Sequence, residues 1–248
     1  MSEPSRKRLT ALVFCLGVLS AGLCSPSFAA AQAKGRADFG AEPASDDARQ
    51  VADLVIASGD DHGLPFVIVD KVSAKVFVFY PDGRIRGAAP ALLGLARGDD
   101  SVPGIGHRKL SSIRPGERTT PAGRFVARLG NDLGEKDVVW VDYDAAVSLH
   151  RVITTKPKER RLQRLATATP LDNRISYGCI NVPADFFDKV VRPAFAGTDG
   201  IVYILPEVRS IHEVFAAIED ERGRQSVAAD ALSTGPAKQS WSTAAVVK

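Results

Sequence analysis

The stretch that decides the fold is FVIVDKVSAKVFVFY, residues 66–80. Its two runs of β-branched and aromatic residues, 66–69 and 75–80, are joined by residues 70–74, and the turn Pro81-Asp82-Gly83 follows the second run. Runs of this composition with turn residues between and after them predict a β-hairpin.

Further short strands are predicted outward from this hairpin, each bounded by Gly, Pro or Asp. They cover residues 124–129, 138–142, 146–150 and 201–205. Helices are expected at 157–166 and 183–191, both of which begin with proline. Many short strands and few helices predict a mainly β fold, a sandwich or a barrel. The glycine- and proline-rich stretch 94–123 is long for an ordered loop, so we expect it to border the active site.

The N-terminus has the order of an export signal. Three basic residues at 6–8 precede an apolar run, 9–23, and small residues follow. We therefore expect residues 1–33 to be a signal peptide and the mature protein to be periplasmic. The apolar run is shorter than the roughly 20 residues that a spanning helix needs. No membrane span is expected in the mature protein, and an uncleaved anchor is the alternative.

The rest of the chain divides into three parts. Residues 34–63 are expected to be a linker with a short helix near 47–57, and residues 64–208 the catalytic domain. Residues 209–248 should form a helix from 211 to about 218 and then a disordered tail. Residues 34–248 carry 29 Lys and Arg against 28 Asp and Glu. The net charge of this part of the chain is therefore close to zero, which does not indicate a nucleic-acid-binding protein.

The segment Ser176-Tyr177-Gly178-Cys179-Ile180-Asn181 holds the candidate nucleophile. Once the signal carrying Cys15 and Cys24 is removed, Cys179 is the only thiol, so it cannot close an internal disulfide. A cysteine needs an imidazole or positive electrostatics to become a thiolate near neutral pH. His150 ends an apolar strand and is the candidate base. A buried structural cysteine is the alternative.

The remaining histidines rank lower. His107 lies in the glycine-rich loop and is a secondary site candidate, whereas His62 and His212 are expected on the surface. A zinc hydrolase using Cys179, His150 and His107 would lack a closely spaced ligand pair. We therefore expect neither a metal nor a cofactor.

Glycine beside the candidate nucleophile suits acyl transfer. Gly178 permits unusual backbone angles, so the amides around Cys179 can converge on an oxyanion. Ser176, Tyr177 and Asn181 would support this turn.

Together, these residues resemble a known signature. Ser176-x-Gly178-Cys179-Ile180-Asn181, with a histidine upstream, is similar to the signature of the L,D-transpeptidases of the YkuD family. Residues 119–125, TTPAGRF, resemble the family's Thr-Pro-x-Gly-x-Phe segment, and residues 66–80 its opening hairpin. The resemblance covers roughly Phe66 to Pro206.

Three departures from the signature point to a proteobacterial branch. Tyr177 replaces a histidine, Arg151 replaces a glycine, and 28 residues separate His150 from Cys179, more than is usual.

The resemblance implies a mainly β, L,D-transpeptidase-like sandwich or barrel in which Cys179 and His150 act on peptidoglycan stem peptides. The thiolate would form an acyl-enzyme, and transfer to an amine would give a 3→3 cross-link. Carboxypeptidase, endopeptidase or protein-anchoring activity at the same site is the alternative. A further alternative is a catalytically inactive envelope-binding domain, in which the replacement of histidine by Tyr177 has abolished turnover.

The segment between the two catalytic candidates is basic. Its cations are Arg151, Lys156, Lys158, Arg160, Arg161, Arg164 and Arg174. We expect Arg151 or Arg174 to meet stem-peptide carboxylates, for which a guanidinium is well shaped. Arg160, Arg161 and Arg164 should be solvent-exposed and matter less. A solvated helix face is the alternative for the whole segment.

Overall fold

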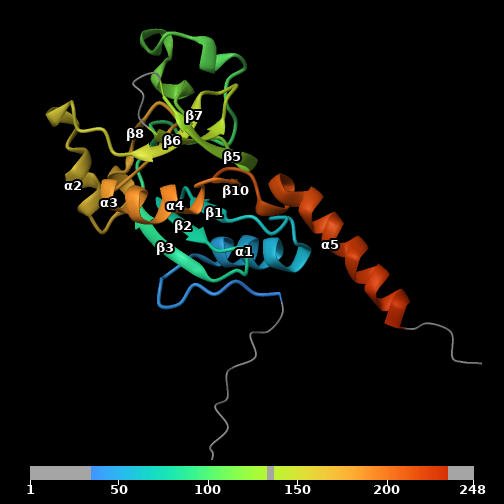
Figure 1. Cartoon of the computed structure of the whole chain (residues 1–248). Coiled ribbons are helices and arrows are strands. Elements are labelled where there is room, and N and C mark those ends of the chain that lie inside the picture. Colours follow the sequence, from blue (N-terminus) through green and yellow to red (C-terminus); the bar gives the residue numbers. More distant parts are fainter. Residues whose placement is uncertain (1–34, 133–136, 234–248) are drawn as a thin grey trace, which may run out of the picture. The chain divides into compact units, whose positions relative to one another are not determined.

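The computed structural model describes residues 35–132 and 137–233 (Figure 1). The expected signal peptide, 1–33, and the end of the expected tail, 234–248, lie outside these residues. The strands are β1 Phe66–Asp70, β2 Lys75–Phe79, β3 Ile85–Pro90, β4 Leu93–Gly94, β5 Gly123–Asn131, β6 Asp137–Asp142, β7 Val147–Arg151, β8 Arg174–Ser176, β9 Ile180–Val182 and β10 Asp199–Ile204. The α-helices are α1 Asp46–Ser58, α2 Arg161–Ala166, α3 Ala184–Phe186, α4 Arg192–Ala194 and α5 Ile211–Ser233.

Short helical turns complete the secondary structure. Those with 3-10 geometry are η1 Ile105–His107, η2 Leu110–Ser112, η3 Pro115–Glu117, η4 Pro157–Glu159 and η5 Pro170–Asp172, and η6 Phe187–Val191 is a π-helix. The expected helix at 157–166 is thus η4 followed by α2, and the one at 183–191 is α3 followed by η6.

Within the described residues, eight strands form one sheet in the order β3-β2-β1-β10-β5-β6-β7-β9, and β4 pairs with β8. The predicted hairpin is confirmed, because β1 and β2 are antiparallel with Phe66 opposite Phe79. The four other predicted strands correspond to β5, β6, β7 and β10. The mainly β fold with a few short helices is therefore confirmed.

The two edges of the sheet meet, so the sheet is a nearly closed barrel. Leu92, just after β3, exchanges two backbone hydrogen bonds with Asn181 of β9, at 2.8 and 2.9 Å. Closure removes the exposed edges that an open sheet would present. It also connects the hairpin half of the sheet to the segment that carries Cys179.

All the residues of β1 are buried. Because successive side chains of a strand point to opposite faces, both faces of β1 are covered. Val67 and Val69 belong to one core cluster, together with Phe187 and Phe195. Their neighbours on the other face belong to a second cluster, which includes residues of α1 and α5. A strand covered on both sides explains the almost uninterrupted apolar run at the start of the fold.

Residues 34–63 were expected to be a linker with a short helix. The helix of this range, α1, is packed into the folded unit. Ser45 caps its first turn by accepting a 3.1 Å bond from the Ala48 N–H, and Gly59 ends it with a positive φ of 66°. Val51 and Val55 are fully buried. The expected helix near 47–57 is confirmed, and its apolar face explains why it packs on the sheet.

The expectation that the last helix ends near residue 218 is wrong, because α5 continues to Ser233. Phe215 and Ile218 anchor its start in the core, and α1 and α5 contact each other. The later residues lack apolar periodicity but are mostly good helix formers.

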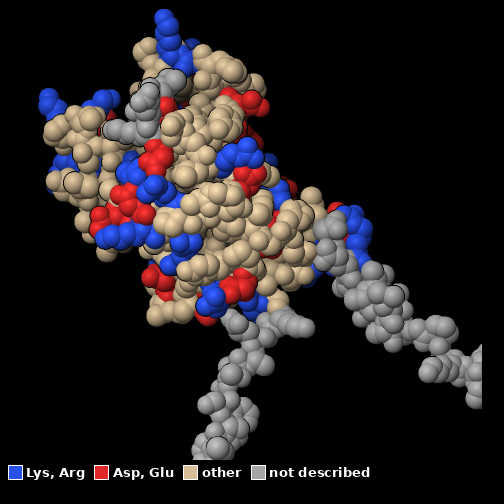
Figure 2. Space-filling view, in the orientation of Figure 1, with Lys and Arg blue, Asp and Glu red and all other residues tan. Residues whose placement is uncertain are grey.

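Acidic and basic side chains are interspersed on the face shown in Figure 2. Within the described residues, no helix combines the length and apolar character needed to cross a bilayer.

Candidate active site

The site is built on the pairing of β7 with β9. The two strands are parallel, and His150 lies opposite Asn181. Since side chains alternate along extended chain, Ser148 and His150 share a face of β7. Cys179 lies two residues before Asn181, directly ahead of β9. The register therefore brings these four side chains together.

A cavity of about 250 Å³ opens at this point. It is lined by Leu110, His150, Ile153, Thr155, Lys156, Glu159, Arg161, Ser176, Tyr177, Cys179 and Asn181. The structure thus gathers five of the side chains singled out from the sequence, those of Cys179, His150, Ser176, Tyr177 and Asn181. A second cavity of about 540 Å³ shares His150 and includes Arg151.

The imidazole of His150 is held in one orientation. Its Nδ1 atom lies 2.7 Å from the carbonyl oxygen of Arg151, which can only accept a hydrogen bond. Nδ1 must therefore carry the proton of this bond, and Nε2 is the nitrogen left for the thiol.

His150 and Cys179 both line the cavity, and their interaction shifts both pKa values. Burial alone lowers the pKa of His150, but the polar interaction with Cys179 and the negative charge of its thiolate outweigh burial and raise that pKa. Burial alone raises the pKa of Cys179, but the polar interaction with His150 and the imidazolium charge outweigh burial and lower that pKa. The two shifts favour a thiolate–imidazolium pair, the reactive form of a cysteine nucleophile.

Ser148 is a site residue that our sequence reasoning missed. Its hydroxyl donates to Cys179 Sγ at 3.6 Å, and the carbonyl of Ala146 lies at the same distance from Sγ. The signal that could have found Ser148 is its position two residues before His150, on the same face of the strand.

The turn before Cys179 requires a glycine. Gly178 has a φ of +135°, and a Cβ there would lie 2.8 Å from the carbonyl oxygen of Thr119. Ser176 fastens the turn, because its hydroxyl accepts from the Gly178 N–H at 3.1 Å and donates to the Cys179 carbonyl at 2.6 Å.

The loop 94–123 borders the site, as expected, and Thr120 joins it to the turn. The fully buried hydroxyl of Thr120 donates to the Gly178 carbonyl at 2.8 Å and accepts from the Gly94 N–H at 2.9 Å. The Thr120 carbonyl in turn accepts from Lys71 Nζ at 2.9 Å.

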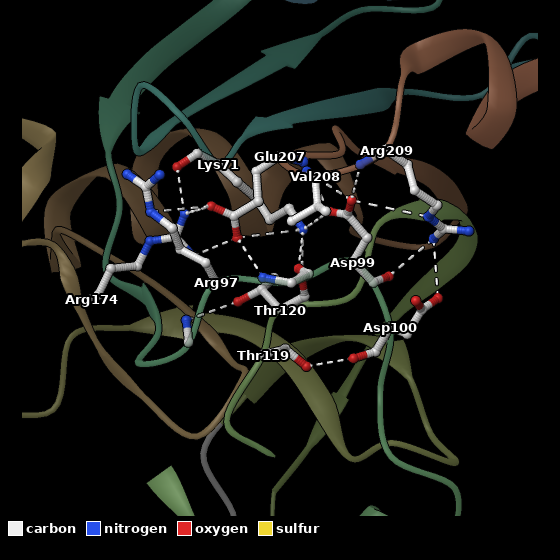
Figure 3. A network of polar contacts seen from close by, with 12 residues as sticks. Lys71, Arg97, Asp99, Asp100, Thr119, Thr120, Arg174, Glu207, Val208 and Arg209 are labelled. Atoms are coloured by element: carbon white, nitrogen blue, oxygen red, sulfur yellow. Dashed lines mark hydrogen bonds and ion pairs between the residues drawn. The ribbon is translucent and has the colours of Figure 1, made fainter. Parts of the chain in front are cut away.

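Lys71 and Asp99 form the centre of the buried polar network in Figure 3. Lys71 Nζ lies 2.7 Å from Asp99 Oδ1, and both side chains are almost completely buried. Burial alone raises the pKa of Asp99, but bonds from Lys71 and from the N–H groups of Arg209 and Glu207 outweigh it and lower the pKa to about 2. The network ties the loop to β1 and to the segment after β10.

Asn181 connects Cys179 and His150 to the basic segment. Its Nδ2 donates to the Cys179 carbonyl at 3.2 Å and lies 3.5 Å from His150 Nε2. Its Oδ1 accepts from Arg161 Nη1 at 2.7 Å. Arg161 is only 13 % exposed, so the expectation that it is a solvated side chain is wrong. Its position depends on the path of the long spacer, for which the sequence carries no signal.

Arg151 and Arg174, which we expected to meet substrate carboxylates, both pair with carboxylates of the protein. Arg151 binds Asp137 at 2.7 Å and Asp188 at 2.8 Å. Arg174 lies in the network of Figure 3, where it makes two bonds to Glu207 at 3.0 and 2.6 Å.

Tyr177, the residue that departs from the signature, is stacked against an arginine. The guanidinium of Arg118 lies 3.9 Å from the centre of its ring. The aromatic side chain thus packs between the glycine-rich loop and the cavity.

The other histidines lie outside the cavity lining. His107 belongs to η1, and His62 and His212 are exposed, as expected. In the part of the chain that the structure describes, no group of three His, Cys, Asp or Glu side chains could hold a metal ion.

No protein-family model matches the chain, and no curated protein matches it in sequence. Among solved structures, the chain is similar to a mutant form of the helical cell shape determining protein Pgp2 of Campylobacter jejuni. The identity is 15 %, over 66 % of this chain and 54 % of that chain, with a TM-score of 0.40. An L,D-transpeptidase from Mycobacterium tuberculosis is also similar, at 15 % identity over 56 % of this chain and 57 % of that chain, with a TM-score of 0.35.

The catalytic domain of an L,D-transpeptidase from E. faecium matches at 16 % identity over 58 % of this chain and 98 % of that domain, with a TM-score of 0.34. The chain therefore spans little more than half the length of the Campylobacter and Mycobacterium proteins and almost all of the E. faecium domain.

Proposed function

We propose that the protein is an exported cysteine L,D-transpeptidase that acts on peptidoglycan stem peptides in the periplasm. The observation that carries the proposal is that Cys179 and His150 line the same cavity, with pKa shifts that favour the charged pair. The resemblance of the Ser176–Asn181 segment to the transpeptidase signature supplies the substrate class.

In the first half of the reaction, the Cys179 thiolate attacks a carbonyl carbon of a tetrapeptide stem. This carbonyl belongs to the amide that joins the third residue, a diamino acid, to the terminal D-alanine. The backbone N–H of Cys179 stabilises the negative charge on the carbonyl oxygen, since that of Gly178 already donates to Ser176. The intermediate collapses as the carbon–nitrogen bond breaks, and the departing amine of D-alanine takes a proton from the His150 imidazolium. A thioester on Cys179 remains.

In the second half, an amine of another stem attacks the thioester and gives a proton to His150. Cys179 leaves as a thiolate, and the new amide is a 3→3 cross-link. Water as the acceptor would make the same site a carboxypeptidase or endopeptidase, and a protein lysine would make it a protein-anchoring enzyme.

The test is mass spectrometry of the protein and its products after incubation with purified disaccharide-tetrapeptide. We expect an acyl-enzyme on Cys179, release of D-alanine and a 3→3-linked dimer. Tripeptide without dimer would indicate water as the acceptor. Absence of both acyl-enzyme and D-alanine release would overturn the proposal and favour an inactive binding domain.

A further inference from the structure

Arginines near the site differ in how much of their charge the protein already neutralises. Arg151 has two carboxylate partners, Asp137 and Asp188, and its guanidinium also lies over the Phe187 ring at 4.4 Å. Arg174 makes a forked pair with the buried Glu207. A substrate carboxylate would have to displace a protein carboxylate at either arginine.

Arg161 differs from both because it lines the cavity that holds Cys179 and His150. Its Nε donates to Glu159 Oε2 at 2.6 Å, and its Nη1 donates to Asn181 Oδ1 at 2.7 Å. These two bonds fix the plane of the guanidinium. Among the described residues they engage only two of its three nitrogen atoms, which leaves the N–H groups of Nη2 for a ligand.

The charges of this cavity wall also favour an anion. Glu159 is shared between Arg161 and the more distant Lys156, whose Nζ lies 3.8 Å from Glu159 Oε1. All three side chains line the cavity, so this part of its wall carries two basic side chains and one acidic side chain. A ligand with a carboxylate would balance the second basic side chain.

We propose that Arg161 binds a carboxylate of the substrate beside Cys179, with Asn181 and Glu159 holding the guanidinium in place. The inference rests on the proposed function and names a recognition element within that site. A guanidinium held at two of its nitrogens loses little further freedom when it binds a carboxylate, and the pairing is charge-assisted. In a stem whose diamino acid is diaminopimelate, two carboxylates flank the amide that is cleaved and are the candidate ligands, that of the terminal D-alanine and that on the diaminopimelate side chain.

The test compares Arg161→Gln, Arg161→Lys and the wild-type protein on three substrates. These are the tetrapeptide, an analogue amidated at the terminal carboxylate, and an analogue amidated at the diamino acid side chain. On the unmodified tetrapeptide, we expect Arg161→Gln to lower kcat/KM by about 10- to 150-fold, the usual range for a hydrogen bond to a charged group. Arg161→Lys should recover part of this loss, because it keeps the charge.

The matched control is Arg160→Gln, which removes an exposed cation from the adjacent position outside the cavity lining. It should leave kcat/KM within about 2-fold of the wild type, because exposed charges contribute little. The analogue that lacks the recognised carboxylate should have a low kcat/KM with the wild-type protein. Arg161→Gln should lower kcat/KM for this analogue only slightly further. That analogue identifies which carboxylate is bound.

An equal loss on all three substrates would overturn the inference, because Arg161 would then act only by positioning Asn181. So would an unchanged kcat/KM in Arg161→Gln. Failure of the proposed function is distinguishable, because the wild-type protein would then form no acyl-enzyme with any of the three substrates. Calorimetric binding of the three peptides to Cys179→Ala, with and without Arg161→Gln, measures recognition without turnover.

Discussion

His150 and Cys179 line the same cavity and shift each other's pKa, although 28 residues separate them in the sequence. Their placement depends on the register of β7 with β9, on the Arg151 carbonyl that fixes the imidazole, and on the glycine turn that places the thiol. Each of these supports can be tested separately from the nucleophile itself.

Replacement of the nucleophile, Cys179→Ala, should abolish acyl-enzyme formation and D-alanine release while the fold survives. The hydrogen bonds of Sγ with other described residues are long, 3.6 Å to Ser148 and to Ala146, so we expect a change in unfolding free energy within about 1 kcal/mol. Intact-mass spectrometry and urea unfolding measure the two effects. A Cys179→Ala protein that still releases D-alanine would remove Cys179 from the mechanism.

The pH dependence of Cys179 alkylation should report the His150 pair. The Cys179 pKa is lowered by His150, so iodoacetamide should react with the wild-type protein at a pH where an ordinary thiol is largely protonated. The rate should fall as the pH drops through the lowered pKa, because the thiolate is lost. His150→Ala should move this profile to higher pH and lower turnover by about 10²- to 10⁴-fold.

His107→Ala is the control, since His107 is not among the residues that line the cavity. Its alkylation profile should match that of the wild type. An unshifted profile in His150→Ala would mean that another group activates the thiol.

Much of the sheet could be predicted from the sequence, because its strands are short apolar runs bounded by Gly, Pro or Asp. The hairpin 66–80 and strands β5, β6, β7 and β10 fall in this class. Strand β3 was missed because its residues, IRGAAP, lack β-branched character after the first. Strands β8 and β9 are only three residues long, too short for a periodic pattern.

The site could be predicted only where chemistry singled out a residue type. Cys179 is found as the one thiol outside the expected signal peptide, and His150 as a histidine that ends an apolar strand. Arg161 could not be found, because tertiary structure decides which of the seven cations in the spacer, here Lys156 and Arg161, line the cavity. Thr120 lies in a segment that we had noted, but its bond to Gly178 spans 58 positions.

Loss of the Thr120 hydroxyl should weaken the Gly178 turn. Thr120→Val leaves the buried Gly178 carbonyl and the Gly94 N–H without this partner, which should cost about 1 to 3 kcal/mol of unfolding free energy. We also expect a lower rate of acyl-enzyme formation, because the turn positions Cys179. Thr120→Ser keeps the hydroxyl and should recover most of the rate. Equal rates in the valine and serine variants would argue against a positioning role for the hydroxyl.

Acid should destabilise the protein partly through Asp99. Its pKa is lowered to about 2 in the folded state from about 3.9 in an unfolded chain, so the folded state favours the ionised carboxylate. This contribution, about 2 to 3 kcal/mol, is fully present above about pH 5 and is lost as the pH falls toward about 1. Urea unfolding of the wild type across this range should show the decline.

Asp99→Asn should remove this component and lower the unfolding free energy near pH 7 by about 2 to 5 kcal/mol, because Lys71 then keeps a buried charge without its nearest carboxylate. The matched control is Asp82→Asn, which breaks the exposed pair of Asp82 with Arg84 and should cost less than about 1 kcal/mol. Similar losses in the two variants would mean that the network of Figure 3 contributes no more to stability than a surface ion pair.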